Sequence, residues 1–129
     1  MKLNTHEWVE KAEADFVSAG REYRARKRPN FDAACFFAQQ CVEKYLKARL
    51  IEAKIVFPKT HDLEALLDLT LPSQPLWEEF RPCLGDLTSF AVAFRYPGES
   101  ATRDMARSAV RDAKRIRARI RRDMGLPAV

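Results

Sequence analysis

The residues from Arg95 to Ser100, Arg-Tyr-Pro-Gly-Glu-Ser, form the segment of this sequence best suited to bind an anion. Tyr96 precedes a proline and the Pro-Gly pair favours a tight turn, so we expect one helix to end near Arg95. Ser100 is expected to cap the next helix, and the free amides of a helix N-terminus attract negative charge. We therefore predict that Arg95, Tyr96, Ser100 and Arg103 bind a phosphate or a nucleotide. The alternative is structural: Arg95 caps the carbonyls of its own helix and Tyr96 packs into the core.

Two histidines, His6 and His61, could move protons near neutral pH without a large pKa shift. His6 falls in the first turn of a predicted helix and is expected to be exposed. His61, in Thr-His-Asp-Leu at residues 60–63, either caps or packs at the start of a short helix or is a weak catalytic candidate. The sequence holds no His-Glu-x-x-His motif, glycine-rich phosphate loop or two-histidine metal spacing, so it indicates no metal site and no cofactor.

Positive charge is concentrated at the end of the chain, where nine Lys and Arg stand against four Asp and Glu from residue 99 onward. Five arginines recur at every fourth position and are expected to face away from the core: Arg103, Arg107, Arg111, Arg115 and Arg119. Like-charged neighbours destabilise their own helix, so stability alone does not explain the row. Two interpretations remain: a solvated surface, or a surface that binds a nucleic-acid backbone or an acidic partner. A basic cluster at residues 21–28 is more typical of solvated surface.

The periodicity of apolar residues predicts the helices that must position these side chains. The first is expected from about Thr5 to Lys27, with Asn4 and Glu7 as a capping pair. Two further helices are expected at residues 31–54 and from the 60–63 motif to just before residue 71. A fourth is expected from about 73 to 94, where Pro82 either kinks the helix or splits it, and a fifth from a serine cap at 100 to near 125. We predict one domain, residues 1–129, folded as an all-α up-and-down bundle of four to five helices.

One predicted helix ends with an unusual stretch, Phe90–Phe94, which is apolar on every side. A helix that is apolar all round must be covered on more than one side. The stretch therefore either lies at the centre of the bundle or meets another subunit.

Composition excludes several classes of protein. With 47% hydrophobic and 32% charged residues, the chain is not collagen-like, low-complexity or disordered. Its longest apolar run, residues 33–38, is far shorter than a membrane span of about 20 residues, and no secretory signal is visible, so a cytoplasmic protein without a membrane segment is expected. Cys35, Cys41 and Cys83 form no metal or disulfide pattern and are interpreted as reduced core residues.

Several motifs follow one another along the chain: Trp8 with Ala12, the run from Ala34 to Ala48, Thr60-His61-Asp62-Leu63 and Arg95-Tyr96-Pro97. The run contains Gln-Gln-x-x-Glu-Lys-x-x-Lys-Ala, and with the later Arg-Tyr-Pro it resembles the HEPN domain, a helical nucleotide-binding domain of prokaryotes and higher eukaryotes, over nearly the whole chain. The resemblance implies a four- to five-helix bundle, usually a homodimer, often encoded beside a small nucleotidyltransferase in a toxin-antitoxin-like module. Many members are metal-independent endoribonucleases.

In those ribonucleases an arginine and a later histidine, separated by four to six intervening residues, line a cleft at the dimer interface. The resemblance implies that Arg95 matches the arginine. The histidine would fall at Ser100, Ala101 or Thr102, so it is missing from this chain. A hydroxyl is too weak a base to replace imidazole unless another group activates it.

The sequence therefore favours a prokaryotic HEPN-type protein that binds RNA, a nucleotide or a partner subunit through Arg95 and the arginines of the last helix, with little or no nuclease activity. One alternative is a metal-independent RNase toxin in which His61 supplies the missing base. A further alternative is a non-catalytic dimeric scaffold whose basic helix binds an acidic partner.

Overall fold

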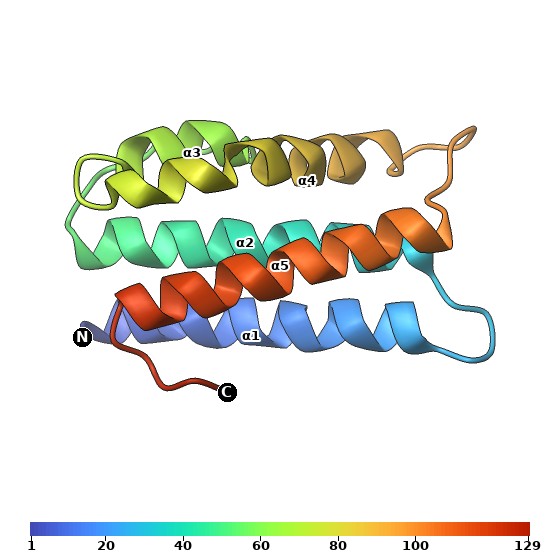
Figure 1. Cartoon of the computed structure of the whole chain (residues 1–129), viewed down its shortest axis with the longest axis horizontal. Helices are drawn as coiled ribbons and strands as arrows, with labels where there is room; N and C mark the ends of the chain where they lie inside the picture. The colour runs from blue at the N-terminus through green and yellow to red at the C-terminus, as the bar shows by residue number, and fades with distance from the viewer.

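The computed structural model describes residues 1–129 as five α-helices and one short 3-10 helix (Figure 1). They are α1 (Leu3–Arg24), α2 (Phe31–Glu52), α3 (Leu63–Thr70), η1 (Pro75–Phe80), α4 (Arg81–Ala93) and α5 (Arg103–Asp123). In Figure 1, α3 and α4 lie on one side of α2 and α1 on the other, while α5 crosses α1 and α2. The predicted all-α bundle is confirmed, and no helix is both long and apolar enough to span a bilayer.

Two of the predicted helix caps are wrong. Asn4 lies inside α1, whose cap position is Lys2 and carries no side-chain hydrogen bond. α5 is capped by Thr102, whose hydroxyl accepts a hydrogen bond from the backbone N–H of Met105 at 3.2 Å, and not by Ser100. Both actual cap positions have extended backbone, which is the conformation that this position requires.

The ends of the first two helices also differ from the prediction. α1 ends at Arg24 instead of Lys27, and α2 ends at Glu52 instead of residue 54. Arg28 and Lys54, which lie just beyond these ends, have positive φ angles of 51° and 60°, outside the right-handed helical region. Pro82 marks the predicted split, because it stands in the first turn of α4, where its missing N–H costs no hydrogen bond.

α2 is the central helix of the bundle and packs against α1, α3, α4 and α5. Its buried positions lie on several sides, which explains why the sequence of this helix is broadly apolar and contains no glycine or proline. Three of the buried residues are polar and stand four positions apart on one face: Gln39, Glu43 and Lys47. A buried polar row of this kind needs partners, and these partners form part of the candidate site.

A network of ionised side chains joins α1, α2 and α5. Glu13 accepts hydrogen bonds from Nε and Nη2 of Arg117, both at 2.6 Å, and from the hydroxyl of Tyr45. Arg121 donates to the same Tyr45 hydroxyl at 3.0 Å and to the carbonyl of Pro127 at 2.9 Å. The network therefore fixes α5 against the other long helices and holds the C-terminal segment in place.

The three cysteines are free, as the sequence predicts. Cys35 and Cys41 are buried on α2, while Cys83 is half-buried. Burial, reinforced by the nearby carboxylate of Asp32, raises the pKa of the Cys35 thiol to about 11, and burial raises that of Cys41 further. Both α2 thiols are therefore protonated at neutral pH and act as small apolar core groups.

Candidate functional site

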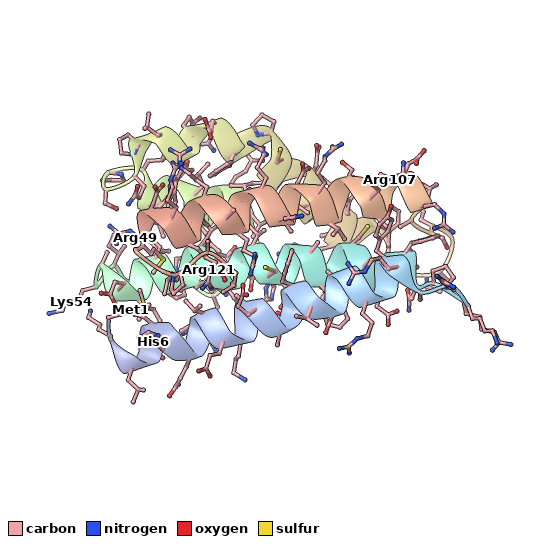
Figure 2. The ribbon with its side chains drawn as sticks, turned by 60° about the horizontal axis from the view of Figure 1, so that its bottom comes forward. Met1, His6, Arg49, Lys54, Arg107 and Arg121 are labelled. Atoms are coloured by element: carbon pink, nitrogen blue, oxygen red, sulfur yellow. The ribbon has the colours of Figure 1, made fainter.

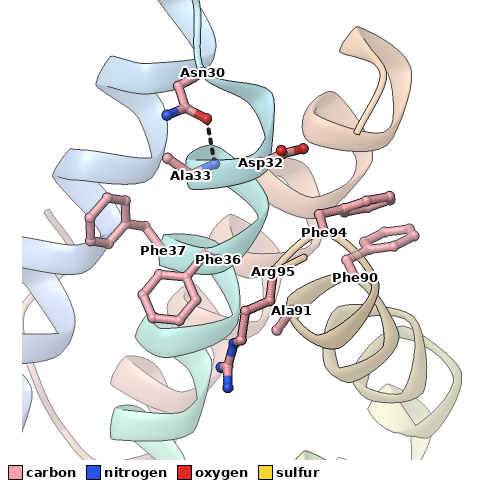
Figure 3. A pocket seen from close by; sticks show the side chains of 9 residues that line it. All are labelled: Asn30, Asp32, Ala33, Phe36, Phe37, Phe90, Ala91, Phe94 and Arg95. Atoms are coloured by element: carbon pink, nitrogen blue, oxygen red, sulfur yellow. Dashed lines mark hydrogen bonds between the residues drawn. The ribbon is translucent and has the colours of Figure 1, made fainter. Parts of the chain in front are cut away.

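Arg95 follows the last turn of α4, and its side chain extends between α4 and α2 (Figure 3). The residue is exposed, and its guanidinium makes no hydrogen bond or ion pair within the chain. It lines two adjoining grooves of about 390 and 320 Å³, which also share Ala91. Arg95 therefore does not cap its own helix and is free to bind an anion from outside.

The smaller of these grooves, called here the polar groove, is lined by six polar residues and two apolar ones from α2, the α3 start and the α4 end. Its lining residues are Gln39, Gln40, His61, Asp62, Thr88, Ala91, Val92 and Arg95. The fold thus brings His61 into the same groove as Arg95, although 33 positions separate them in the sequence. The distance between the two residues along the sequence does not predict that they lie close together in the fold.

His61 is held from behind by the buried carboxylate of Glu43. The His61 Nδ1 lies 2.9 Å from Glu43 Oε1, while the histidine side chain is 76% exposed and the glutamate side chain only 4%. An ionised carboxylate accepts hydrogen bonds and cannot donate them, so Nδ1 carries the proton in this contact. The Nε2 atom is then left with its lone pair in the neutral imidazole.

Glu43 is itself fixed by neighbours on its own helix. Gln39 Nε2 donates to Glu43 Oε1 at 3.1 Å and Lys47 Nζ donates to Oε2 at 3.1 Å. The same Gln39 amide donates to the backbone carbonyl of His61 at 3.2 Å, so the histidine is held through both its ring and its main chain. The Lys47 ammonium lies 5.8 Å from the ring centroids of both Trp8 and Phe57, which shield it from water.

The larger groove, called here the aromatic groove, lies between the first turns of α2 and the end of α4 (Figure 3). Four phenylalanines line it: Phe36 and Phe37 from α2, Phe90 from α4 and Phe94 directly after α4. Asn30, Asp32 and Arg95 supply its polar atoms. The apolar stretch at the end of α4 is therefore at the surface of the chain and not at its centre, since Val92 within it is 60% exposed.

The other predicted phosphate-binding residues do not gather around Arg95. Tyr96 is 65% exposed and does not fill the core. Ser100 lines a neighbouring hollow beside the α2 start, which shares Asn30 and Asp32 with the aromatic groove but is not lined by Arg95. Arg103 lies over the ring of Phe31, with its guanidinium carbon 5.0 Å from the ring centroid. The structure therefore groups Arg95 with His61 and the α2 glutamines instead of with the start of α5.

The five-arginine row of α5 lies on the side of the helix away from the core, and its second half contacts neighbouring elements. Arg115 lies 5.2 Å from the ring centroid of Phe80, and Arg119 pairs with Glu79 and Asp123 at 3.0 and 2.9 Å. Four of the five arginines are exposed, in agreement with the expectation that the row faces away from the core. Arg119 is half-buried, because successive i,i+4 positions advance around the helix until the row meets η1.

The first three arginines of the row are exposed. Arg107, near the start of α5 (Figure 2), contacts Tyr23 and Asp104 with a side chain 55% exposed, and that of Arg111 is 70% exposed. By contrast, Arg121 lies between α5 and the helices beneath it. None of the α5 residues lines the polar or the aromatic groove, so the basic face of α5 is a separate surface.

No role was predicted for Gln39, Glu43 and Lys47, although all three belong to the motif between Ala34 and Ala48. A signal was present: three polar residues at positions i, i+4 and i+8 lie on one face of a helix that is otherwise apolar there. Such a face requires a polar partner from another element. In this fold the partner is the segment that contains His61.

The family model of the HEPN domain matches residues 5–123. The chain belongs to the HEPN domain family. Domains of this family form helical bundles and are generally related to nucleotides or RNA. No curated protein and no solved structure matches the chain.

The loop at residues 100–102, where the sequence resemblance implied a histidine, contacts the start of α2. The backbone N–H of Ala101 donates to Asp32 Oδ1 at 2.6 Å, which ties the loop before α5 to the start of α2. His61 of the α3 segment lines the Arg95 groove instead. No group of three or more His, Cys, Asp or Glu side chains is arranged to hold a metal ion.

Proposed function

We propose that this HEPN domain binds RNA or a nucleotide through its phosphate, with Arg95 as the principal contact. The observation that carries the proposal is the position of the Arg95 guanidinium, which is exposed, unpaired and shared by two grooves. A planar guanidinium can hold two phosphate oxygens at once. The amide of Gln40 lines the polar groove beside it and offers a further hydrogen bond to a ribose or phosphate, whereas both N–H groups of Gln39 already donate to Glu43 and to the His61 carbonyl.

Replacing Arg95 by alanine is expected to weaken RNA binding at least tenfold, because a charge-assisted, bidentate contact is lost. The measurement is a fluorescence titration of labelled single-stranded RNA, and of nucleotides, at fixed salt. Arg122→Ala is the matched control, since that side chain is 71% exposed and lies at the far end of α5. Equal affinity of the wild type and Arg95→Ala would remove the proposed site.

The proposal includes a homodimer and a partner encoded with it. The exposed Val92 and Tyr96 at the end of α4 offer an apolar surface for a second copy. The basic face of α5 suits an acidic partner, such as a small nucleotidyltransferase of a toxin-antitoxin-like module. Salt-sensitive copurification of a second chain without nucleic acid would favour the scaffold function over RNA binding.

A second candidate function is metal-independent cleavage of RNA, and the contact between His61 and Glu43 favours it. With Nδ1 bound to a carboxylate, the neutral imidazole presents a basic Nε2 in the groove that Arg95 also lines. His61 would accept the proton of a ribose 2′-hydroxyl, the 2′-oxygen would bond to the adjacent phosphorus as the bond from phosphorus to the 5′-oxygen breaks, and water would protonate the departing 5′-oxygen. Arg95 would stabilise the charge that develops on the phosphate.

If the protein cleaves RNA, cleavage is expected to persist in chelator and to fall by about a hundredfold or more in both His61→Ala and Arg95→Ala. The measurement follows RNA length on a denaturing gel after incubation with purified protein and EDTA. His6→Ala is the matched control, because His6 is exposed and lines neither groove. Uncut RNA that still binds in an Arg95-dependent manner would reject cleavage and leave the binding function intact.

A further inference from the structure

We propose that the aromatic groove binds the base of the nucleotide whose phosphate Arg95 holds, so that the ligand is an unpaired nucleotide, either free or within single-stranded RNA. This inference rests on the proposed function. It adds a base-binding subsite and excludes base-paired RNA as the preferred ligand. Three features of the groove favour a base: its four phenylalanines, the polar atoms at its rim and its continuity with the polar groove.

The rings in the aromatic groove come in two pairs on facing helices. Phe36 and Phe37 meet edge to face with centroids 5.7 Å apart, and Phe90 and Phe94 stack with centroids 5.9 Å apart. The volume of about 390 Å³ falls within the range of small-molecule sites. Nucleobases stack on aromatic side chains, and this stacking is the usual way in which proteins hold the bases of single strands.

The rings are also accessible from solvent. Phe36 is 37% exposed, a large fraction for a phenylalanine that lies next to a core helix. Phe90 and Phe94 are only partly buried against the core. A flat base can therefore contact their faces without any change in the packing of α2 against α4.

Polar atoms at the rim favour a nucleotide over an apolar segment of a second copy. Asp32 uses one carboxylate oxygen to accept from Ala101, while its other oxygen makes no hydrogen bond. Asn30 uses its carbonyl oxygen to accept from Ala33 at 2.9 Å, which leaves its amide N–H groups free. These groups can pair with the edge of a base, whereas an apolar side chain would bury them and Arg95 without partners.

The two grooves meet in a way that matches the parts of a nucleotide. Arg95 and Ala91 line both of them, so a phosphate bound by Arg95 lies between an aromatic compartment and a polar one. A base in the aromatic groove places its sugar and phosphate at Arg95. The next nucleotide of an RNA strand then extends toward His61 and the glutamines.

The test compares three RNA ligands of about eight nucleotides, which is within the usual range for one single-strand binding module. They are a fluorescent oligoadenylate, the same oligoadenylate paired with oligouridylate, and an abasic strand of equal length and charge. The wild type is expected to bind the single strand at least tenfold more tightly than either of the other two. AMP measured against ribose 5-phosphate tests the same base preference in a free nucleotide, and AMP measured against the oligoadenylate distinguishes a free nucleotide from an RNA ligand.

Variants of Phe36 separate base stacking from phosphate binding. Phe36→Leu keeps an apolar side chain but removes the aromatic face, so we expect it to lose about fivefold or more in affinity for single-stranded RNA and none for the abasic strand. Phe36→Tyr keeps the ring and is expected to retain the preference. Both variants are expected to fold, because Phe36 is at the surface.

Two results would overturn the base-binding subsite while leaving the proposed function standing. One is equal affinity of the wild type for the oligoadenylate and the abasic strand, with both weakened in Arg95→Ala. The other is a change of oligomeric state in Phe36→Leu, measured by light scattering, with no change in base preference, which would assign the groove to a second copy. Affinities that do not depend on Arg95 at all would instead reject the proposed function.

Discussion

Replacing Glu13 by alanine is expected to lower the free energy of unfolding by about 3 kcal/mol. The substitution leaves two buried guanidinium groups without their anion, since the side chains of Arg117 and Arg121 are only 8% and 9% exposed. Loss of one partner from a buried ion pair costs about 3–5 kcal/mol. The lower end applies because the Glu13 side chain is 27% exposed and the arginines keep hydrogen bonds to Val129 and Pro127.

Urea denaturation at several pH values measures this effect and identifies its cause. Burial alone would raise the pKa of Glu13, but hydrogen bonds from Arg117 and Tyr45 outweigh it and hold the pKa below its usual value of 4.5. A carboxylate whose pKa is lowered on folding stabilises the protein above pH 4.5, and this contribution is lost as the pH falls further. Glu13→Gln should therefore show a weaker loss of stability below pH 4.5 than the wild type.

The control for this substitution is Glu10→Ala on the exposed side of α1. Glu10 forms no ion pair, so its replacement is expected to change stability by no more than about 0.5 kcal/mol. A loss of less than about 1 kcal/mol in Glu13→Ala would mean that water replaces the carboxylate and that the network is not essential for fixing α5.

Local rules predicted the helices of this protein well but not their contacts. The 3.6-residue spacing of apolar side chains revealed each helix, and a proline in the first turn marked the start of α4. The cap of α5 was misplaced because serine and threonine both suit this position, and serine is the stronger cap of the two. The choice between them depends on a long-range hydrogen bond, in which Asp32 fixes the loop at Ala101.

The candidate site was predictable only in part. Arg95 stands in a recognisable sequence context, and the structure leaves it exposed as that context requires. Arg95 and His61 line one groove because α2 packs against both α3 and α4. The spacing of residues along the sequence does not predict this packing. The contacts of Arg115 and Arg119 with η1 were not predicted for the same reason, since a helical wheel shows one helix and not its neighbours.

Replacing Glu43 by alanine is expected to destabilise the protein by about 3–5 kcal/mol, the largest effect among the polar residues considered. Its side chain is 4% exposed and that of Lys47 is 10% exposed, so the substitution buries an unpaired ammonium. The amide of Gln39 loses a hydrogen bond at the same time. Thermal or urea unfolding measures the loss, with Glu7→Ala on exposed α1 surface as the control.

A double substitution separates the charge from the packing. Removal of both partners of a buried pair in favour of apolar groups of similar volume is often close to neutral, so Glu43→Leu combined with Lys47→Met is expected to recover most of the stability. Methionine suits the place of Lys47 between the rings of Trp8 and Phe57. If the double variant is as unstable as Glu43→Ala, packing and not charge explains the effect.

The double variant also tests whether Glu43 affects RNA binding and cleavage in the polar groove. It keeps Arg95 and both groove-lining glutamines, so binding of single-stranded RNA is expected to change by less than about threefold if Arg95 is the principal contact. His61 loses the carboxylate that fixes its tautomer, and any chelator-resistant cleavage is expected to fall by about a hundredfold. Retention of full cleavage would mean that Glu43 supports only the fold of α2 and that the orientation of His61 does not depend on it.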